Sequence, residues 1–381
     1  MRIAPRRSLV AAGATALALA LAACGGQPAA VAPTAAPAAL PTAAPAAVAP
    51  TTGTAAKLDG IKTYLLGKVA DLKASSAALK ASSDSYYALA KEANFDYAAL
   101  RDQHGAEVAT MLQAARSQWK TASPLYEQVE GVVAGVPSLA EYDLILDAGA
   151  SGAEGGDSVV PFDLTLPDGR VLPKPGNLFG VTESTLWGTY ADFTAKDVTL
   201  DVDGDGKDSL GDVLPDANVL KAAADALDSY VSQLEGSAQI WQPTDSDAFT
   251  ALVVMVPTMN EYFDSWKNSR FVAGDTSTQR DFVAISRLAD IQDILSGLQV
   301  VYGEVSPQVA NVDAAQAAQA GQRLNDLKAF VADVYQQEQG GKRFSPEEAD
   351  LLGAEAQNRA TAIAGQLTQL SAQLNVPLQG Q

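Results

Sequence analysis

Apolar residues recur at three- and four-residue steps over most of the chain beyond about residue 57. This spacing covers 58–90 and 98–119, and a further run over 123–133 opens with Ser123-Pro124. Serine can cap a helix and proline fits the first turn that follows, so this dipeptide indicates a new helix. Because such steps place apolar side chains on one face of an α-helix, the first part of the folded chain is predicted to form three helices.

The same period returns in the second half. The last of the helices predicted there opens with Ser345 as its cap, Pro346 in its first turn and Glu348 completing a capping box. Pro257 is expected to bend another of them. Helices of about twenty residues with short connections pack as antiparallel bundles, so we predict an all-α antiparallel double helical bundle. The remaining helices of this half are predicted over 219–234, 247–267, 280–302 and 314–337.

An insertion of about 148–215 interrupts this pattern and is rich in Gly, Pro and Asp. Residues 159–166 carry strand-forming side chains, 167–170 read Pro-Asp-Gly-Arg, and Val171-Leu172 follow. A short polar turn between two apolar stretches is typical of a β-hairpin. We expect this hairpin to lie on the helical body.

The first 56 residues indicate export and anchoring. Residues 1–23 have the basic start and short apolar stretch of a secretory signal peptide. Cys24 follows Leu-Ala-Ala, which resembles the lipobox of bacterial lipoproteins, whose cysteine is lipidated and becomes the first mature residue; an ordinary signal peptide with an incidental cysteine is the alternative. Residues 24–56, with the lipidated Cys24 at their start, are then an Ala/Pro/Thr-rich linker of extended chain. The helical domain spans 57–381.

Charge and composition narrow the function. The chain has 26 Lys and Arg against 45 Asp and Glu, a net charge of −19, with one Cys and one His. A single cysteine excludes an intrachain disulfide framework, and a single histidine excludes a His-pair metal motif. Because phosphate contacts need clustered basic side chains, we expect no nucleic-acid partner.

The sharpest local motif is the twelve-residue segment 201–212, which has the ligand pattern of an EF-hand calcium loop. Glycine stands at its sixth position, as the sharp turn requires, and the last position is Asp rather than Glu. We predict that it binds Ca²⁺ and fixes the insertion to the bundle; a solvated acidic turn is the alternative. The predicted ligands are Asp201, Asp203, Asp205, the backbone carbonyl of Lys207, Ser209 and Asp212.

A second candidate metal site is indicated by two acidic residues together with the sequence features around them. Glu127 and Glu130 share a helix face, where they would bind a cation or meet solvent. The order of features along 58–375 resembles the imelysin-like family, which includes imelysin peptidase-like lipoproteins and EfeO-type periplasmic iron-uptake proteins. These features are Trp119-Lys120, Tyr126-Glu127-x-x-Glu130, Glu183 ahead of Leu186-Trp187, the segment 266–271, and Gly340-Gly341 before Phe344-Ser345.

The resemblance implies an all-helical double bundle and a signature Gly-x-His-x-x-Glu just before a Leu-Trp pair. Aligning that pair places Glu183 on the motif glutamate, Gly180 on the histidine and Leu178 on the glycine, so the signature is degenerate. By resemblance, Glu127, Glu130 and Glu183 are the positions for a second metal. With carboxylates alone, hard ions such as Fe(III), Ca²⁺ or Mn²⁺ are favoured over Zn²⁺.

These observations predict an extracytoplasmic, lipid-anchored metal-binding lipoprotein in iron or other cation uptake, with a structural calcium site. Its expected partners are the cell membrane, through the lipid anchor, and a metal-uptake permease or other surface proteins. The main alternative is a calcium-stabilised structural or interaction lipoprotein that has lost the family metal site. A metallopeptidase is the weaker alternative, and we do not expect an enzyme, since no His-Glu set supplies a metal-bound water.

Overall fold

The computed structural model describes residues 58–207 and 209–380. The predicted signal peptide, the linker and Cys24 lie outside the described residues. Within the described residues the chain is mostly helical, which confirms the predicted all-α class. None of the described helices combines the length and apolar character that a membrane span needs.

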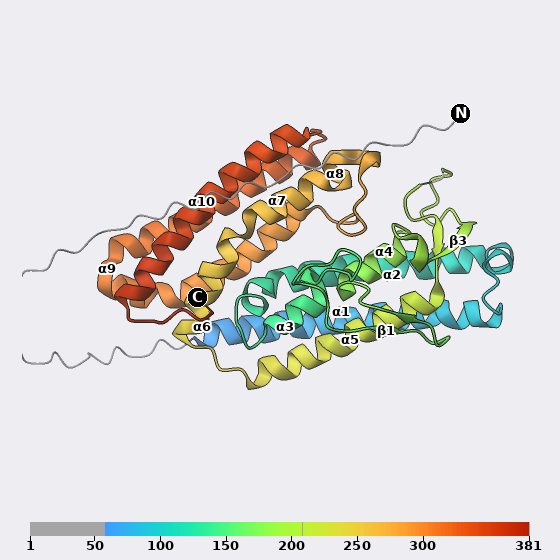
Figure 1. Ribbon diagram of the computed structural model, residues 1–381, viewed down its shortest axis with the longest axis horizontal. Helices are drawn as coiled ribbons and strands as arrows, with labels where there is room; N and C mark the ends of the chain where they lie inside the picture. The colour runs from blue at the N-terminus through green and yellow to red at the C-terminus, as the bar shows by residue number, and fades with distance from the viewer. Residues whose placement is uncertain (1–57, 208, 381) are drawn as a thin grey trace, which may run out of the picture. The chain divides into compact units, whose positions relative to one another are not determined.

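The first group of helices contains α1 (Asp59–Glu92), α2 (Tyr97–Val133) and α5 (Ala217–Ile240). Helix α1 packs along both α2 and α5 (Figure 1). The predicted apolar face of α1 is buried, because Leu65, Val69 and Leu72 are fully covered. The short helix α4 (Leu178–Leu186), which no helical prediction covered, packs against α5 and α2.

The prediction of a separate helix at Ser123 is wrong, because Pro124 lies inside the continuous helix α2. Proline inside a helix removes one backbone hydrogen bond, and here the flanking Trp119 and Tyr126 are buried and hold the helix against its neighbours. The break in α2 lies instead at His104, whose φ of −130° is not helical.

The second group contains α6 (Asp245–Met255), α7 (Met259–Asn268), α9 (Arg287–Gln339) and α10 (Pro346–Gln373). Helix α10 packs on the other three, and α9 also contacts α2 of the first group (Figure 1). A 3₁₀ turn, Val256–Thr258, separates α6 from α7 at the proline that predicted a bend. The predicted capping box of α10 is confirmed, because the Ser345 and Glu348 side chains each accept the other residue's backbone N–H.

Helix α9 reverses direction at Asp313, where φ is −151° and ψ is 97°. The Tyr302 hydroxyl donates to the Ala317 carbonyl at 2.5 Å, and the Gln299 amide donates to Asn325 at 2.6 Å. These contacts place the two halves side by side and antiparallel, in agreement with two predicted helices. The first half begins at Arg287 rather than at the predicted residue 280.

The insertion holds the predicted hairpin, with strands of only two residues. Strand β1 (Leu164–Thr165) pairs antiparallel with β2 (Val171–Leu172). A second antiparallel pair, β3 (Thr194–Thr199) with β4 (Val213–Pro215), was not predicted and flanks the acidic loop 201–212. The remaining short elements are α3 (Ala140–Asp143), a π-helical turn (Leu144–Ala148), 3₁₀ turns at Ala191–Phe193 and Gly274–Thr276, and α8 (Arg270–Ala273).

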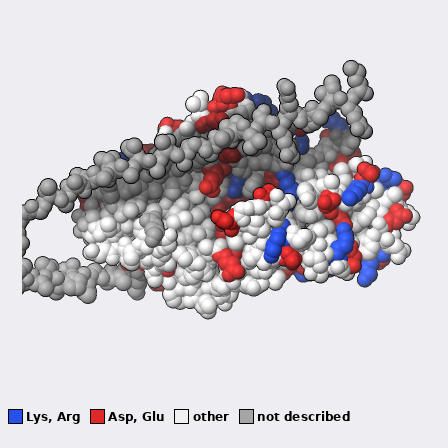
Figure 2. Space-filling model, viewed as in Figure 1, with Lys and Arg blue, Asp and Glu red and all other residues white. Residues whose placement is uncertain are grey.

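Charged side chains on the surface form pairs between helices. Lys80 of α1 lies 2.7 Å from Asp84 and 2.8 Å from Asp225 of α5. Lys221 of α5 also bonds to Asp84, which links the same two helices. Over the right half of the face in Figure 2, acidic and basic side chains are interspersed.

Candidate metal centre

Glu127, Glu130 and Asp147 form a buried group of carboxylates, called here the carboxylate cluster. Each offers one oxygen within 4.8 Å of the oxygens of the other two. Their exposed fractions are 2%, 3% and 6%. Carboxylate oxygens are the ligands that hard cations prefer, so this cluster is the strongest candidate metal centre among the described residues.

Local structure explains how these three side chains meet. Glu127 and Glu130 are three residues apart on α2 and therefore share one face, which is buried where α2 meets α9 and α7. Asp147 belongs to the π-helical turn that follows α3. Such turns distort a helix locally and are frequent at functional sites, which fits an acidic residue placed inside the protein.

The first turn of α9 adds two charged side chains to the cluster. The guanidinium of Arg287 lies 3.0 Å from the Asp290 carboxylate and 3.4 Å from that of Glu127. The same guanidinium lies over the rings of Phe282 and Tyr262, at 3.9 Å and 4.7 Å from their centroids. Arg287 is thus a positive charge built into the cluster and packed against two aromatic rings.

Arg287 does not provide a hydrogen-bond partner for every buried polar atom of the cluster. The Oε2 atoms of Glu127 and Glu130 and the Nε atom of Arg287 are buried and have no hydrogen-bond partner among the described residues. A buried polar group without a partner costs about 1–3 kcal/mol, and a charged one costs more. Two unpartnered carboxylate oxygens that belong to one cluster indicate a place for a further cation.

Burial shifts the titration of Glu127, Asp147 and Asp290. It raises the pKa of Asp147 to about 7 and that of Asp290 to about 6, while Arg287 acts in the opposite direction. Burial and the neighbouring carboxylates also raise the pKa of Glu127 well above its ordinary value. Glu127 and about half of the Asp147 side chains therefore retain a proton near neutral pH unless another positive charge is present.

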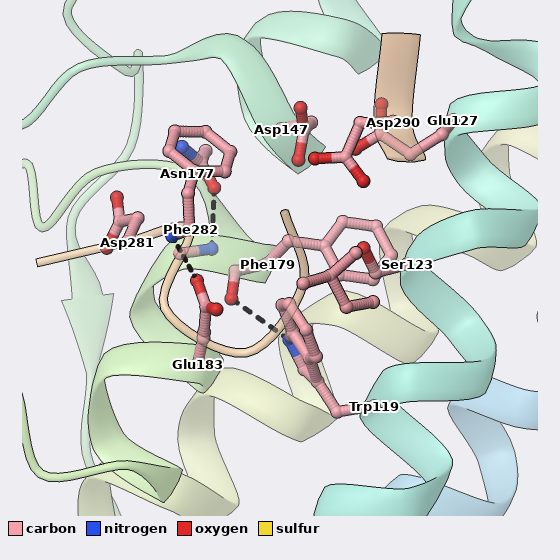
Figure 3. Close-up of a pocket in the computed structure, with 12 residues that line it drawn as sticks. Trp119, Ser123, Glu127, Asp147, Asn177, Phe179, Glu183, Asp281, Phe282 and Asp290 are labelled. Carbon is pink, nitrogen blue, oxygen red and sulfur yellow. Dashed lines mark hydrogen bonds between the residues drawn. The ribbon is translucent and has the colours of Figure 1, made fainter. Parts of the chain in front are cut away.

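A small cavity adjoins the cluster. Its volume is about 10 Å³, close to the least that holds one water molecule. Figure 3 shows the side chains of Glu127, Asp147 and Asp290 gathered on one side, while that of Glu183 points toward Phe282. The wall also includes Trp119, Ser123, Asn177, Phe179, Gly180, Asp281 and Ile285.

Glu183 lies on α4, on a different wall of this cavity. Its carboxylate accepts hydrogen bonds from the backbone N–H groups of Phe282 at 2.7 Å, Val283 at 2.9 Å and Ala284 at 2.8 Å. Burial raises its pKa to about 8, although the three N–H donors act in the other direction. The structure therefore brings Glu127 and Glu130 together with Asp147, and it places Glu183 against the 282–284 backbone.

Gly180 leaves no room for a larger side chain. A Cβ atom at this position would lie 2.5 Å from Oδ2 of Asp281. Arg280 holds that carboxylate through two hydrogen bonds, of 2.8 Å and 3.0 Å. The space beside Gly180, where the family resemblance places a histidine, is thus filled by a carboxylate. His104, the sole histidine, lies elsewhere on α2, 3.4 Å from Glu107.

The acidic loop has its three leading carboxylates close together. Asp201, Asp203 and Asp205 each offer an oxygen within 4.8 Å of the others, and all three are exposed. The Asp201 carboxylate accepts the backbone N–H groups of Gly204 at 2.7 Å, Asp205 at 3.1 Å and Gly206 at 3.0 Å. The loop is therefore folded around its first aspartate, with Gly206 at a φ of 73°.

The last residue of the loop, Asp212, is buried, unlike the three leading aspartates. Its carboxylate accepts the backbone N–H groups of Val202 at 3.1 Å and Ser209 at 2.7 Å. The Lys207 backbone N–H donates to Asp205 at 2.8 Å, and its ammonium lies 3.5 Å from the same carboxylate. The Arg116 side chain of α2 donates to the carbonyl of Gly211, which ties the loop to the helical body.

Sequence reasoning missed four residues around the cluster: Asp147, Arg287, Asp290 and Tyr262. A signal for three of them exists. Asp147 follows Leu-Ile-Leu, while Arg287 and Asp290 lie on the helix face that also carries Ile291 and Ile294. Charged residues on a face that is otherwise apolar are rarely buried unless they are paired, so their positions indicate an internal polar site.

The Imelysin family model, Peptidase M75, matches residues 61–374. This range contains the carboxylate cluster, the acidic loop and both groups of helices. No significant match is found among curated proteins.

Proposed function

The chain belongs to the imelysin family, and from that premise we propose that it binds a hard metal cation at the carboxylate cluster for uptake or storage outside the cytoplasm. Iron is the foremost candidate. One observation carries this proposal: the Oε2 atoms of Glu127 and Glu130 are buried without a partner among the described residues. A bound cation would satisfy both atoms at once.

The donor set determines the class of cation. Glu127, Glu130, Asp147 and Asp290 supply only oxygen, and no histidine or cysteine lies among the described residues that line the cavity. Oxygen donors favour hard ions such as Fe(III), Mn²⁺ or Ca²⁺ over Zn²⁺. When a multivalent cation displaces the protons from these four acids, their negative charge exceeds the single positive charge of Arg287, and the cation balances the remainder.

Binding is favoured over hydrolysis by the size of the cavity. A catalytic metal needs an open coordination position for water and room for the substrate. The space beside the cluster measures about 10 Å³, which is too small for a peptide group. A metallopeptidase would cleave a mixed peptide library when supplied with Zn²⁺ or Mn²⁺, and we expect no cleavage.

We also propose that Cys24 is lipidated and holds the protein on the outer side of a membrane, where a metal-uptake permease or another surface protein is its partner. Support comes from the basic, apolar and lipobox-like segments that precede Cys24. Several acyl chains on one cysteine would anchor the chain stably. Replacing Cys24 by Ser should move the protein from the membrane fraction to the soluble fraction.

The acidic loop is proposed as a structural Ca²⁺ site that joins the insertion to α2. The clustering of Asp201, Asp203 and Asp205 supports this role, because three exposed carboxylates within 4.8 Å repel one another without a cation. The bond from Arg116 to Gly211 gives the loop a fixed attachment. Calcium would therefore stiffen a segment that is already connected to the body.

A second candidate function is a calcium-stabilised interaction protein without a second metal. Two observations favour it: Arg287 already supplies a cation to the cluster, and Asp281 fills the space beside Gly180. The two candidates differ in whether a metal binds outside the acidic loop.

Metal analysis by mass spectrometry separates these candidates. The mature chain is analysed after dialysis and again after iron loading, as wild type and as the Glu130→Gln and Glu141→Gln variants. Glu141 is exposed on α3 and serves as the matched control. We expect one equivalent of iron beyond calcium in wild type and Glu141→Gln, and its loss in Glu130→Gln. Calcium alone in all three would favour the interaction protein.

A further inference from the structure

Tyr262 of α7 reaches the carboxylate cluster from the second group of helices. Its hydroxyl donates a hydrogen bond of 2.6 Å to Oε1 of Glu130, and its side chain is buried, with 8% of the residue exposed. The ring lies against the Arg287 guanidinium at 4.7 Å. Tyr262 is therefore fixed from two directions, with its oxygen beside an acid whose other oxygen has no partner among the described residues.

We propose that Tyr262 is itself a metal ligand, and that its phenolate oxygen binds Fe(III) together with Glu130 and the other carboxylates of the cluster. This inference rests on the proposed function and extends it by naming a ligand and an oxidation state. It makes the site a mixed phenolate and carboxylate centre rather than a set of carboxylates alone.

The distance between the two oxygens fits neighbouring positions on one ion. When ligand bonds of about 2.0–2.1 Å meet at right angles around a six-coordinate ion, adjacent ligand oxygens lie about 2.9 Å apart. The oxygens of Tyr262 and Glu130 are 2.6 Å apart. A shift of a few tenths of an ångström would let both oxygens contact one cation.

The unpartnered Oε2 atom of Glu130 is an independent observation that points to a ligand. The residue is 3% exposed, so neither bulk solvent nor a described side chain satisfies this atom. Oε2 of Glu127 is in the same state on the same helix face. A cation placed near Tyr262 would thus gain one oxygen from α7 and two from α2.

The chemistry of the phenol selects the metal. A phenolate is a hard, singly charged oxygen donor, and it matches a small, highly charged ion such as Fe(III) better than a large divalent one. On binding, the O–H bond of Tyr262 breaks, an iron–oxygen bond forms and one proton is released to solvent. The oxidation state of the metal does not change, so no oxidant or reductant is required.

Tyr126 provides a matched comparison inside the same region. It is also a fully buried tyrosine, on α2, and its hydroxyl donates to Oδ1 of Asp143 at 2.8 Å. Asp143 is not among the three clustered acids. Replacing Tyr126 by Phe removes a buried hydroxyl from a carboxylate, as in Tyr262→Phe, but removes no hydrogen bond to the three clustered acids.

Visible absorption tests the proposal. The mature chain is loaded with ferric citrate, desalted, and measured for bound iron by mass spectrometry and for absorption, as wild type, Tyr262→Phe and Tyr126→Phe. Tyrosinate bound to Fe(III) gives a charge-transfer band in the visible range, which carboxylate ligands alone do not give. We expect the band in wild type and Tyr126→Phe, and its loss per bound iron in Tyr262→Phe.

Resonance Raman spectroscopy of the wild-type protein adds a measurement that does not depend on the folding of any variant, and tyrosinate ring modes are expected. Bound iron without the band or these modes would overturn the proposal and leave the carboxylate site standing. A band that persists in Tyr262→Phe, or that disappears in Tyr126→Phe, would overturn it as well. No bound iron in wild type would overturn both this inference and the proposed iron site.

Discussion

The Glu183 carboxylate holds Phe282 in a strained backbone conformation. Its Oε2 atom accepts the N–H of Phe282 at 2.7 Å, and Phe282 has a φ of 59°, in the left-handed region that non-glycine residues rarely adopt. The Phe282 ring in turn covers the Arg287 guanidinium at 3.9 Å. Glu183 thus supports the position of Arg287 in the carboxylate cluster through an intervening residue, without bonding to that arginine.

Replacing Glu183 by Ala should destabilise the protein by about 3 kcal/mol, because three backbone N–H groups at 282–284 lose the side chain that accepts their hydrogen bonds. Urea unfolding measures the effect. Glu183→Gln is the matched control and should lose less, since its carbonyl oxygen still accepts a hydrogen bond. Wild-type stability in Glu183→Ala would show that these bonds do not hold the segment.

Gly180→Ala tests whether Asp281 fills the neighbouring space. Glycine to alanine in an open helix position stabilises by about 1 kcal/mol, so a free space predicts a gain. The structure predicts a loss instead, because the new Cβ would meet Oδ2 of Asp281 at 2.5 Å. Combining it with Asp281→Ala should restore the gain relative to Asp281→Ala alone. Thermal unfolding of the four proteins gives this comparison, and a stabilising single variant would contradict the geometry.

The helical spacing of apolar residues predicted much of the fold, because this spacing shows which side chains are buried. The faces carrying Leu65 and Val69, the bend at Pro257 and the capping box at Ser345 all appear as the local pattern indicated. The spacing did not predict that α2 continues through Pro124. Proline marks a helix start by local preference, and here the packing of neighbouring residues prevails over that preference.

The site was predictable only in part. Glu127 and Glu130 are adjacent on one helix, so their spacing alone brought them together. Asp147 and Tyr262 come from distant segments, and only the tertiary packing shows that they meet the same acids. The role of Glu183 as an acceptor for backbone N–H groups has no signature in the sequence, since it depends on the path of a loop about a hundred residues away.

Without metal, stability should fall as pH rises from about 5 to 8. The native pKa of Asp147 is about 7 and that of Asp290 about 6, whereas aspartates in an unfolded chain titrate near 3.9. Between these values the folded state binds more protons than the unfolded state, so raising the pH favours unfolding. The slope is about 1.4 kcal/mol per pH unit for each proton.

Urea unfolding in chelator at several pH values measures this slope. Asp147→Asn removes one of the titrating groups and should make the dependence shallower. Acids with a lowered pKa, such as Asp84 beside Lys221, act below this range and do not oppose the trend. A stability that is constant or that increases from pH 5 to 8 would contradict the assignment of protons to these acids.

Calcium should stabilise the protein through the acidic loop, by about 2.7 kcal/mol when its concentration is a hundred times the dissociation constant. Asp205→Asn should gain less, because asparagine keeps the side-chain oxygen that accepts the Lys207 N–H at 2.8 Å but loses the charge. In chelator this variant should be at least as stable as wild type. Asp197→Asn, exposed on β3 outside the loop, is the control. Equal stabilisation by calcium in both variants would contradict the loop as the site.

Arg287 should compete with a metal for the cluster. Arg287→Met keeps an unbranched apolar side chain between Phe282 and Tyr262 but removes the charge that lies 3.4 Å from Glu127. Breaking a buried pair by removing one partner costs about 3–5 kcal/mol, so the variant should be less stable than wild type in chelator. It should also bind Mn²⁺ more tightly, because the carboxylates no longer share their charge with a guanidinium.

Thermal unfolding with and without Mn²⁺ separates these two effects, since the first lowers the melting temperature in chelator and the second enlarges the rise on adding metal. Arg270→Met is the matched control, because Arg270 of α8 pairs with the exposed Asp275 of the following 3₁₀ turn and not with the carboxylate cluster. Its effect should stay within about 0.5 kcal/mol. Weaker Mn²⁺ binding in Arg287→Met would mean that the guanidinium organises the carboxylates for the cation, and the competition described here would then be wrong.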